Sequence, residues 1–163
     1  MKRKKADLPR RIYQFSQGAV RHVNWREVEP MPPGKWPGIY GDVETELIVC
    51  RENSGAKQTV MGRSVYHSGS YHEPHCHFLA EEFIYCLSGK CVVGRGTEEY
   101  LFVPGDVQFA GIEEIHWLRN PFQEPVEFIW VYSGAGMPFE SGYATPDIFE
   151  EAMKVFKQGK MPE

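Results

Sequence analysis

The sequence predicts an all-β protein built around a single barrel or sandwich, and three observations support this. The chain has 163 residues, close to the usual length of one domain. Its composition, 42% hydrophobic, 13% aromatic and 25% charged, is that of a globular chain able to bury a core. Between about residues 44 and 132, short runs rich in Val, Ile, Phe and Tyr alternate with Gly, Pro or Asn. This spacing favours a sandwich or barrel over strand-helix-strand units.

Residues 1–42 are expected to form an extended N-terminal arm that packs on the barrel. Pro30, Pro32 and Pro33 exclude a long helix there. The basic run at residues 2–5 is interpreted as a solvated end, because a short charged terminus is more often solvated than a tail that binds nucleic acid or an anionic membrane. The formal net charge of −4 also argues against a surface built to bind nucleic acid.

The barrel itself is expected over residues 43–135. Its strands are predicted at residues 45–50, 59–66, 82–87, 91–94, 99–103 and 126–131. The four cysteines lack the spacing of a zinc ribbon and are expected to be buried thiols. A disulfide between Cys86 and Cys91, across a turn, is the alternative.

Residues 136–163 are expected to form a C-terminal segment with a helix at about 146–158. Thr145 can cap this helix, Pro146 suits its first position, and Gly159 offers a stop. Apolar residues recur inside it at helical spacing, so the helix is expected to cover the barrel or a partner subunit.

Candidate metal ligands concentrate in the middle of the chain. Side chains two apart on a strand share a face, so His75 and His77 can point together into a barrel. A carboxylate a few residues later can complete one side of a metal shell, and Glu81 and Glu82 both qualify. Neutral imidazole and carboxylate suit divalent Fe, Mn, Co, Ni or Zn.

A further histidine, His116, lies about forty residues after this pair, beyond a turn at Gly105 and Asp106, and is expected on the next strand. It would complete coordination of one divalent transition metal by three histidines and one glutamate. Such a set leaves positions on an octahedral ion for water or substrate.

These residues resemble the cupin superfamily, whose first motif reads Gly, five residues, His-x-His, three or four residues, Glu, six residues, Gly. Gly69, His75, His77, Glu82 and Gly89 stand at those spacings. The resemblance selects Glu82 over Glu81 as the ligand. It also implies a cupin barrel, a jelly-roll-like double-stranded β-helix.

The second motif of that family is matched only in part. Gly105, His116 and Asn120 agree with its ends, but Gly111 replaces a proline and Glu113 replaces a glycine. These departures are expected to affect the geometry of a turn rather than the ligand.

Other polar residues near the motif are assigned from strand alternation. Tyr71 and Glu73 are expected to share the face of His75 and are the candidate catalytic acid or base. An interior aromatic with a satisfied hydroxyl is the alternative for Tyr71. His72 is expected to point outward. Arg63 is expected on the surface, with a clamp on a substrate carboxylate as its alternative.

The resemblance implies a range of functions that includes dioxygenases, decarboxylases, isomerases, lyases and non-catalytic binding domains. Fold alone does not choose among them. The leading hypothesis is a metal-dependent enzyme that acts on a small oxygen-bearing organic substrate by dioxygenase-type cleavage or by lyase or isomerase chemistry. The alternative is a non-catalytic cupin that binds or senses a small ligand. Lyases of dimethylsulfoniopropionate are disfavoured, because they carry a tyrosine where this chain has Ile84.

The expected partners are a small-molecule substrate and a second copy of the chain, with neither nucleic acid nor membrane. A homodimer formed by strand or arm exchange is predicted, because exposed sheet edges tend to be paired or covered. No run approaches the roughly 18 apolar residues of a membrane span, and no signal peptide is recognised, so a cytoplasmic location is expected.

Overall fold

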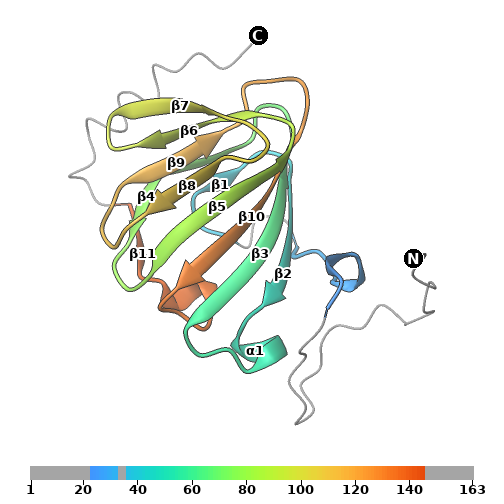
Figure 1. The fold of residues 1–163 in the computed structure, drawn as a ribbon, viewed down its shortest axis with the longest axis vertical. Helices are drawn as coiled ribbons and strands as arrows, with labels where there is room; N and C mark the ends of the chain where they lie inside the picture. Colours follow the sequence, from blue (N-terminus) through green and yellow to red (C-terminus); the bar gives the residue numbers. More distant parts are fainter. Residues whose placement is uncertain (1–22, 33–35, 146–163) are drawn as a thin grey trace.

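Two antiparallel sheets face each other in the computed structural model, which describes residues 23–32 and 36–145 (Figure 1). The prediction of an all-β barrel is thereby confirmed. The helix predicted at about 146–158 lies outside the described residues. Within the described part of the chain, no helix has the length and apolar character needed to cross a membrane.

The six predicted strands each coincide with an observed strand to within two residues at either end. The elements in chain order are η1 (Trp25–Glu27), β1 (Ile39–Tyr40), β2 (Val43–Val49), α1 (Arg51–Ser54), β3 (Thr59–Tyr66), β4 (Tyr71–His77), β5 (Glu81–Ser88), β6 (Cys91–Arg95), β7 (Glu98–Phe102), β8 (Val107–Ala110), β9 (His116–Arg119), β10 (Val126–Ser133), η2 (Pro138–Glu140) and β11 (Tyr143–Ala144). The sequence predicted His116 on the strand directly after the turn at Gly105. In the structure β8 follows that turn, and His116 lies on the strand after it, β9.

The first sheet has the order β1-β4-β9-β6-β7, with β11 also paired to β4, and the second has the order β2-β3-β10-β5-β8. The chain passes from β5 to β6, and so between sheets, at Gly89. This residue has a φ of 73°, and a Cβ there would lie 2.0 Å from the carbonyl oxygen of Pro125. Because β5 and β6 belong to different sheets, Cys86 and Cys91 do not face each other across a hairpin. All four cysteines are buried and free, as expected.

The core lies between the two sheets and follows strand alternation. On β10 the buried residues Val126, Phe128, Trp130 and Tyr132 alternate with half-buried ones. Trp130 lies opposite Gly62 of β3, where a Cβ would come within 2.1 Å of the indole. Glycine at this position therefore makes room for the largest side chain of the strand.

Arg63 of β3 differs from both predictions made for it. Its guanidinium forms ion pairs with Glu46 (2.9 Å) and Glu127 (2.5 Å), and Trp25 covers it at 3.7 Å from the ring centroid. The side chain is buried, because the segment around η1 packs over this part of the sheet. Arg63 is also not among the residues that line the interior cavity, so it does not clamp a substrate there.

Strand β4 is enclosed on both edges. One edge pairs with β9, and the other pairs with β1 at its beginning and with β11 at its end. The two short strands come from segments before and after the main run of strands (Figure 1). The strand that carries two candidate ligands is thus held by chain segments about a hundred residues apart.

Candidate metal centre

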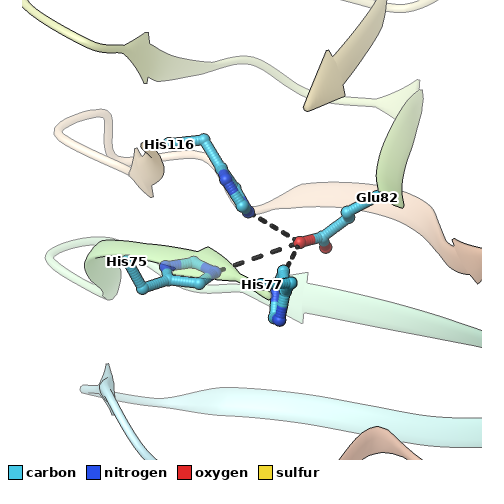
Figure 2. A group of neighbouring side chains, drawn as sticks. All are labelled: His75, His77, Glu82 and His116. Carbon is cyan, nitrogen blue, oxygen red and sulfur yellow. Dashed lines mark hydrogen bonds and ion pairs between the residues drawn. The ribbon is translucent and has the colours of Figure 1, made fainter. Parts of the chain in front are cut away.

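Three strands bring the four predicted ligands together. β4 supplies His75 and His77, β5 supplies Glu82, and β9 supplies His116. All four are buried, and one donor atom from each lies within 4.8 Å of the others. Figure 2 shows the three rings directed toward the carboxylate. The alternative ligand Glu81 is exposed, because residues of β5 alternate between solvent and interior.

The contacts converge on one carboxylate oxygen. The Oε2 atom of Glu82 lies 2.7 Å from Nε2 of His116, 3.1 Å from Nε2 of His77 and 3.9 Å from Nε2 of His75 (Figure 2). All three rings therefore present the same nitrogen to the centre.

The opposite nitrogens of the rings are held from outside the centre. Nδ1 of His75 donates to the carbonyl oxygen of Glu73 (2.7 Å), and Nδ1 of His116 donates to that of Glu114 (2.9 Å). A carbonyl can only accept, so in the neutral rings the proton sits on Nδ1 and the Nε2 lone pair faces inward. Nδ1 of His77 lies 2.9 Å from the Ser141 hydroxyl. Such outer hydrogen bonds orient metal-binding imidazoles.

The arrangement fits a divalent metal. Lone pairs of imidazole nitrogens and a carboxylate oxygen repel one another unless a cation lies among them. The Nε2 atom of His75 is buried and has no hydrogen-bond partner, which is a cost that a metal bond would remove. These four side chains form a potential metal-binding site of three histidines and one glutamate.

Burial and mutual contacts tune the charges of the ligands. Burial lowers the pKa of His75 to about 4, so this ring is neutral at neutral pH. Burial alone would raise the pKa of Glu82, but its contacts with the three histidines outweigh it and hold that pKa well below its usual range. For His116, burial is outweighed by the contact with Glu82, which raises the pKa of this ring. A proton and a metal ion therefore compete for the place between His116 and Glu82.

Strand β4 does not keep the regular alternation that the sequence analysis assumed. Its register against β9 shifts by one residue between His72 and His75, at a β-bulge that contains Pro74. His72 consequently faces inward, stacks on His75 with ring centroids 3.9 Å apart, and lines the cavity. The prediction that His72 points outward is wrong.

The same bulge overturns the expected placement of Tyr71 and Glu73. Tyr71 stacks on Tyr40 at 4.8 Å, and the carboxylate of Glu73 accepts hydrogen bonds from the hydroxyls of Tyr40 (3.4 Å) and Tyr143 (3.3 Å). Neither lines the cavity, so they do not share the face of His75. Their suggested acid-base role loses its geometric basis. Pro74 was the available signal, because proline inside a sheet is confined to edges and bulges.

The sequence did not predict two residues that lie near the centre. Ser141 contacts His77, and the ring of Tyr143 lies 5.0 Å from that of His75. They reach the centre because β11 pairs with β4, with Tyr143 opposite His77. Nothing in their local sequence indicates this pairing, which depends on the path of the chain after β10.

The turn before His116 carries two departures from the second motif and is held against β4. Glu113, at the motif's glycine position, adopts a left-handed backbone with a φ of 64°. Its amide donates to the carbonyl oxygen of His77 (2.9 Å), which ties the turn to β4. At the end of the motif, fully buried Asn120 donates to the carbonyl oxygens of Tyr66 and Glu124, both at 2.8 Å.

A cavity of about 370 Å³ opens from the metal centre into the barrel. Its volume is that of a small-molecule site. The four ligands share its wall with His72 and with aromatic side chains. The aromatic residues are Trp36, Tyr66, Trp117, Phe128, Trp130, Tyr132, Phe139 and Tyr143.

Comparisons with known proteins agree with this description. A family model described as a cupin domain matches residues 62–132. A crystal structure described as a predicted oxalate decarboxylase from Thermotoga maritima is 26% identical, with a TM-score of 0.63, and the match covers 69% of this chain and 97% of that one. The search of curated proteins found no match.

Two further structures share the fold at lower identity. The polyketide cyclase RemF from Streptomyces resistomycificus is 18% identical, with a TM-score of 0.66, over 88% of this chain and 99% of that one. A sugar phosphate isomerase from Silicibacter pomeroyi is also 18% identical, with a TM-score of 0.58, over 69% of this chain and 74% of that one. With its two facing sheets, the spacing of its motifs and the match of the family model, this chain has the cupin fold, and its residues 62–132 match the cupin domain.

Proposed function

We propose that this protein is a metal-dependent enzyme that binds a small oxygen-bearing organic substrate at His75, His77, Glu82 and His116. The observation that supports this most directly is the arrangement of the histidines. Three Nε2 atoms and one carboxylate oxygen converge, while both carbonyl-bound rings are fixed through Nδ1. The candidate ions are Fe, Mn, Co, Ni and Zn, because imidazole and carboxylate ligands accept all of them.

The chain's own residues define what happens around the ion. The bound metal would supply Lewis-acid polarisation of a substrate oxygen, or the redox chemistry that dioxygen cleavage needs. Glu82 contributes a negative charge, and the outer hydrogen bonds of His75 and His116 fix the ring orientations. The aromatic walls exclude water and confine the substrate in the cavity.

The reaction class stays open between dioxygenase-type cleavage and lyase or isomerase chemistry. The similar structures are described as a predicted decarboxylase, a cyclase and an isomerase, so the fold supports several reactions. A non-catalytic cupin that binds or senses a small ligand is the alternative.

Elemental analysis of purified protein tests the proposal, with the His75→Ala, His77→Ala double variant alongside. We expect about one ion per chain in the natural protein and almost none in the variant. Oxygen uptake with a panel of small acids and phenols then separates dioxygenase chemistry from lyase or isomerase chemistry. Equal metal content in the two proteins would contradict binding at these histidines. Metal without turnover of any substrate would contradict the proposed enzymatic function.

We also propose that the protein forms a homodimer, in the cytoplasm. The outer face of β5 and of the edge strand β8 carries five exposed apolar side chains: Phe83, Tyr85, Leu87, Val107 and Phe109. Phe83 lies opposite Phe109, and Tyr85 lies opposite Val107, so the surface continues across both strands. A two-fold axis can bring this face against its own copy.

Light scattering at micromolar concentration tests the homodimer. The natural protein should have the mass of two chains, and Phe109→Lys should have the mass of one while keeping its metal. A monomeric natural protein would refute this proposal.

A further inference from the structure

We propose that the substrate is a flat aromatic compound that carries two neighbouring oxygens and at most one negative charge. This inference rests on the proposed function, because it assumes a metal at the four ligands. It goes beyond it by excluding small dianions, such as dicarboxylates and phosphate esters. The argument comes from the charges of the cavity, its walls and one unsatisfied donor.

The cavity offers no cation to an anionic substrate apart from the metal. Among the described residues that line it there is neither lysine nor arginine. Glu52, the carboxylate in the lining besides the ligand Glu82, is exposed and adds a negative charge. A second negative charge on the substrate would therefore be buried without a partner, which is costly.

The arginines near the barrel pair with carboxylates outside the cavity. Four of them form ion pairs with carboxylates, and none of the four lines the cavity. The pairs are Arg51 with Glu140, Arg63 with Glu46 and Glu127, Arg95 with Glu114, and Arg119 with Glu99. If one of these arginines moved to bind a substrate, its carboxylate would lose its partner, which is costly where the pair is buried.

The charge of the occupied centre limits the substrate to one negative charge. A divalent ion contributes +2, Glu82 contributes −1, and the neutral rings contribute nothing, so the sum is +1. One ionised oxygen, as in a phenolate or an enolate, balances this charge. Four protein ligands leave two positions on a six-coordinate ion, which suits two neighbouring oxygens.

The walls next to the centre favour a flat ring. Tyr132 lies 4.6 Å from His77 and 5.2 Å from Trp130, between ring centroids. Trp36 then meets Trp130 edge to face at 6.0 Å. These rings extend the cavity away from the metal with apolar, rigid surfaces that stack on another ring.

Outside the four ligands, Trp36 and His72 of the described wall each carry a buried ring nitrogen without a hydrogen-bond partner, and of these only the Trp36 nitrogen is always a donor. The Nε1 atom of Trp36 is buried and makes no hydrogen bond. An indole N–H can only donate, so it calls for an acceptor oxygen on the ligand. Trp130, by contrast, donates its Nε1–H to Ser64 at 3.0 Å and is already satisfied. Trp36 thus points to a further oxygen on the aromatic substrate.

Binding to zinc-loaded protein tests the inference without any turnover, with quenching of tryptophan fluorescence as the readout. Naphthalene-2,3-diol is the probe, naphthalene-2,3-dicarboxylate keeps the ring but adds charge, and oxalate has the charge without the ring. We expect the diol to bind at least about ten-fold more tightly than either dianion. Zinc content is measured after each titration, so that loss of metal to the ligand is detected.

Two variants sharpen the test. Gln108→Lys adds a cation to the half-buried cavity wall and should raise the affinity for the dicarboxylate several-fold relative to that for the diol. Trp36→Phe keeps a ring but removes the N–H, and should weaken an aromatic ligand with a third oxygen, such as naphthalene-1,2,4-triol, by about three-fold. Trp25→Phe, outside the cavity, is the matched control and should change neither affinity.

The outcomes separate the two proposals. If the natural protein binds no zinc, or the His75→Ala, His77→Ala variant binds it equally, the proposed metal function fails. If zinc binds normally but the dicarboxylate or oxalate binds as tightly as the diol, only the present inference fails. If the diol binds equally with and without zinc, chelation by its oxygens is refuted.

Discussion

Two neighbouring layers of the barrel interior differ in the backbone that positions their side chains. In the metal layer, Glu82 of β5 lies opposite Tyr132 of β10, and in the next layer Ile84 lies opposite Trp130. The apolar layer is placed by regular pairing of strands. The metal layer also needs irregular backbone, because its histidines are held by groups in a bulge, a turn and the segment before β11.

We infer from this difference that the two layers have different roles. The apolar layer stabilises the fold and shapes the cavity, whereas the metal layer concentrates charge and hydrogen bonds at a cost to stability. Substitutions in the first should change the free energy of unfolding, and substitutions in the second should change metal affinity.

The largest effect should come from the apolar layer. Trp130→Ala removes an indole that is 7% exposed and fills the space over Gly62. We expect a loss of about 3–5 kcal/mol in the free energy of unfolding, measured by urea denaturation. Tyr100→Ala, at a residue 49% exposed, is the control and should cost much less. Similar losses for the two would show that the layer does not carry the stability assigned to it.

The metal layer should respond most strongly to Glu82→Gln. This change removes the charged ligand and keeps the size of the side chain, so metal affinity should fall by at least about 100-fold. Competition with a chromogenic chelator measures the affinity. The exposed neighbour provides the matched control, because Glu81→Gln should leave metal affinity unchanged. A loss of affinity in both variants would point to a general effect of charge.

Acid should destabilise the metal-free protein through the same layer. The pKa of His75 is about 4 in the folded chain, below the ordinary value of 6.5, so the unfolded chain binds more protons between these values. Stability is then present above pH 6.5 and is lost as pH falls toward 4, by up to about 3 kcal/mol. Glu82 acts in the same direction and His116 opposes it. Urea denaturation in EDTA at pH 7 and pH 5 measures this loss, and His75→Gln should reduce it.

The outer hydrogen bonds of the metal layer should have a smaller effect. Ser141→Ala removes the hydroxyl beside Nδ1 of His77 and should lower metal affinity by about ten-fold. Ser54→Ala, at a hydroxyl bonded to the Cys50 carbonyl in α1, is the control. Unchanged affinity in Ser141→Ala would show that packing alone orients the ring of His77.

The smallest effect should come from the turn between β8 and β9, which precedes His116. Glu113→Gly relieves a left-handed backbone and should stabilise the protein by up to about 1 kcal/mol. Thermal unfolding measures the gain. Destabilisation would mean that the Glu113 side chain contributes more than its backbone costs.

The sequence predicted the regular parts of the molecule better than the irregular ones. Apolar runs located six strands to within two residues, and motif spacing located four residues whose donor atoms converge. Alternation failed at β4, because one extra residue at Pro74 exchanged the faces of Tyr71 and His72. The burial of Arg63 was missed because its cover, Trp25, comes from a distant segment.

The sequence does not predict which metal ion the site holds. Three imidazoles and a carboxylate accept several ions. The contacts of Ser141 and Tyr143 were beyond sequence reasoning, since they depend on a two-residue strand pairing far along the chain.

The enclosure of β4 has a kinetic consequence. The edge of β4 opposite β9 pairs with two residues of β1 and two of β11, and the amide of Glu73 adds a hydrogen bond to the carbonyl oxygen of Gly38. Detaching these short strands breaks few contacts and leaves the five-stranded sheet intact, so such openings should be far more frequent than global unfolding. The residence time of a bound ion would then follow the amide exchange rate of this edge. The segments that flank the barrel would thus govern how long the protein keeps its metal.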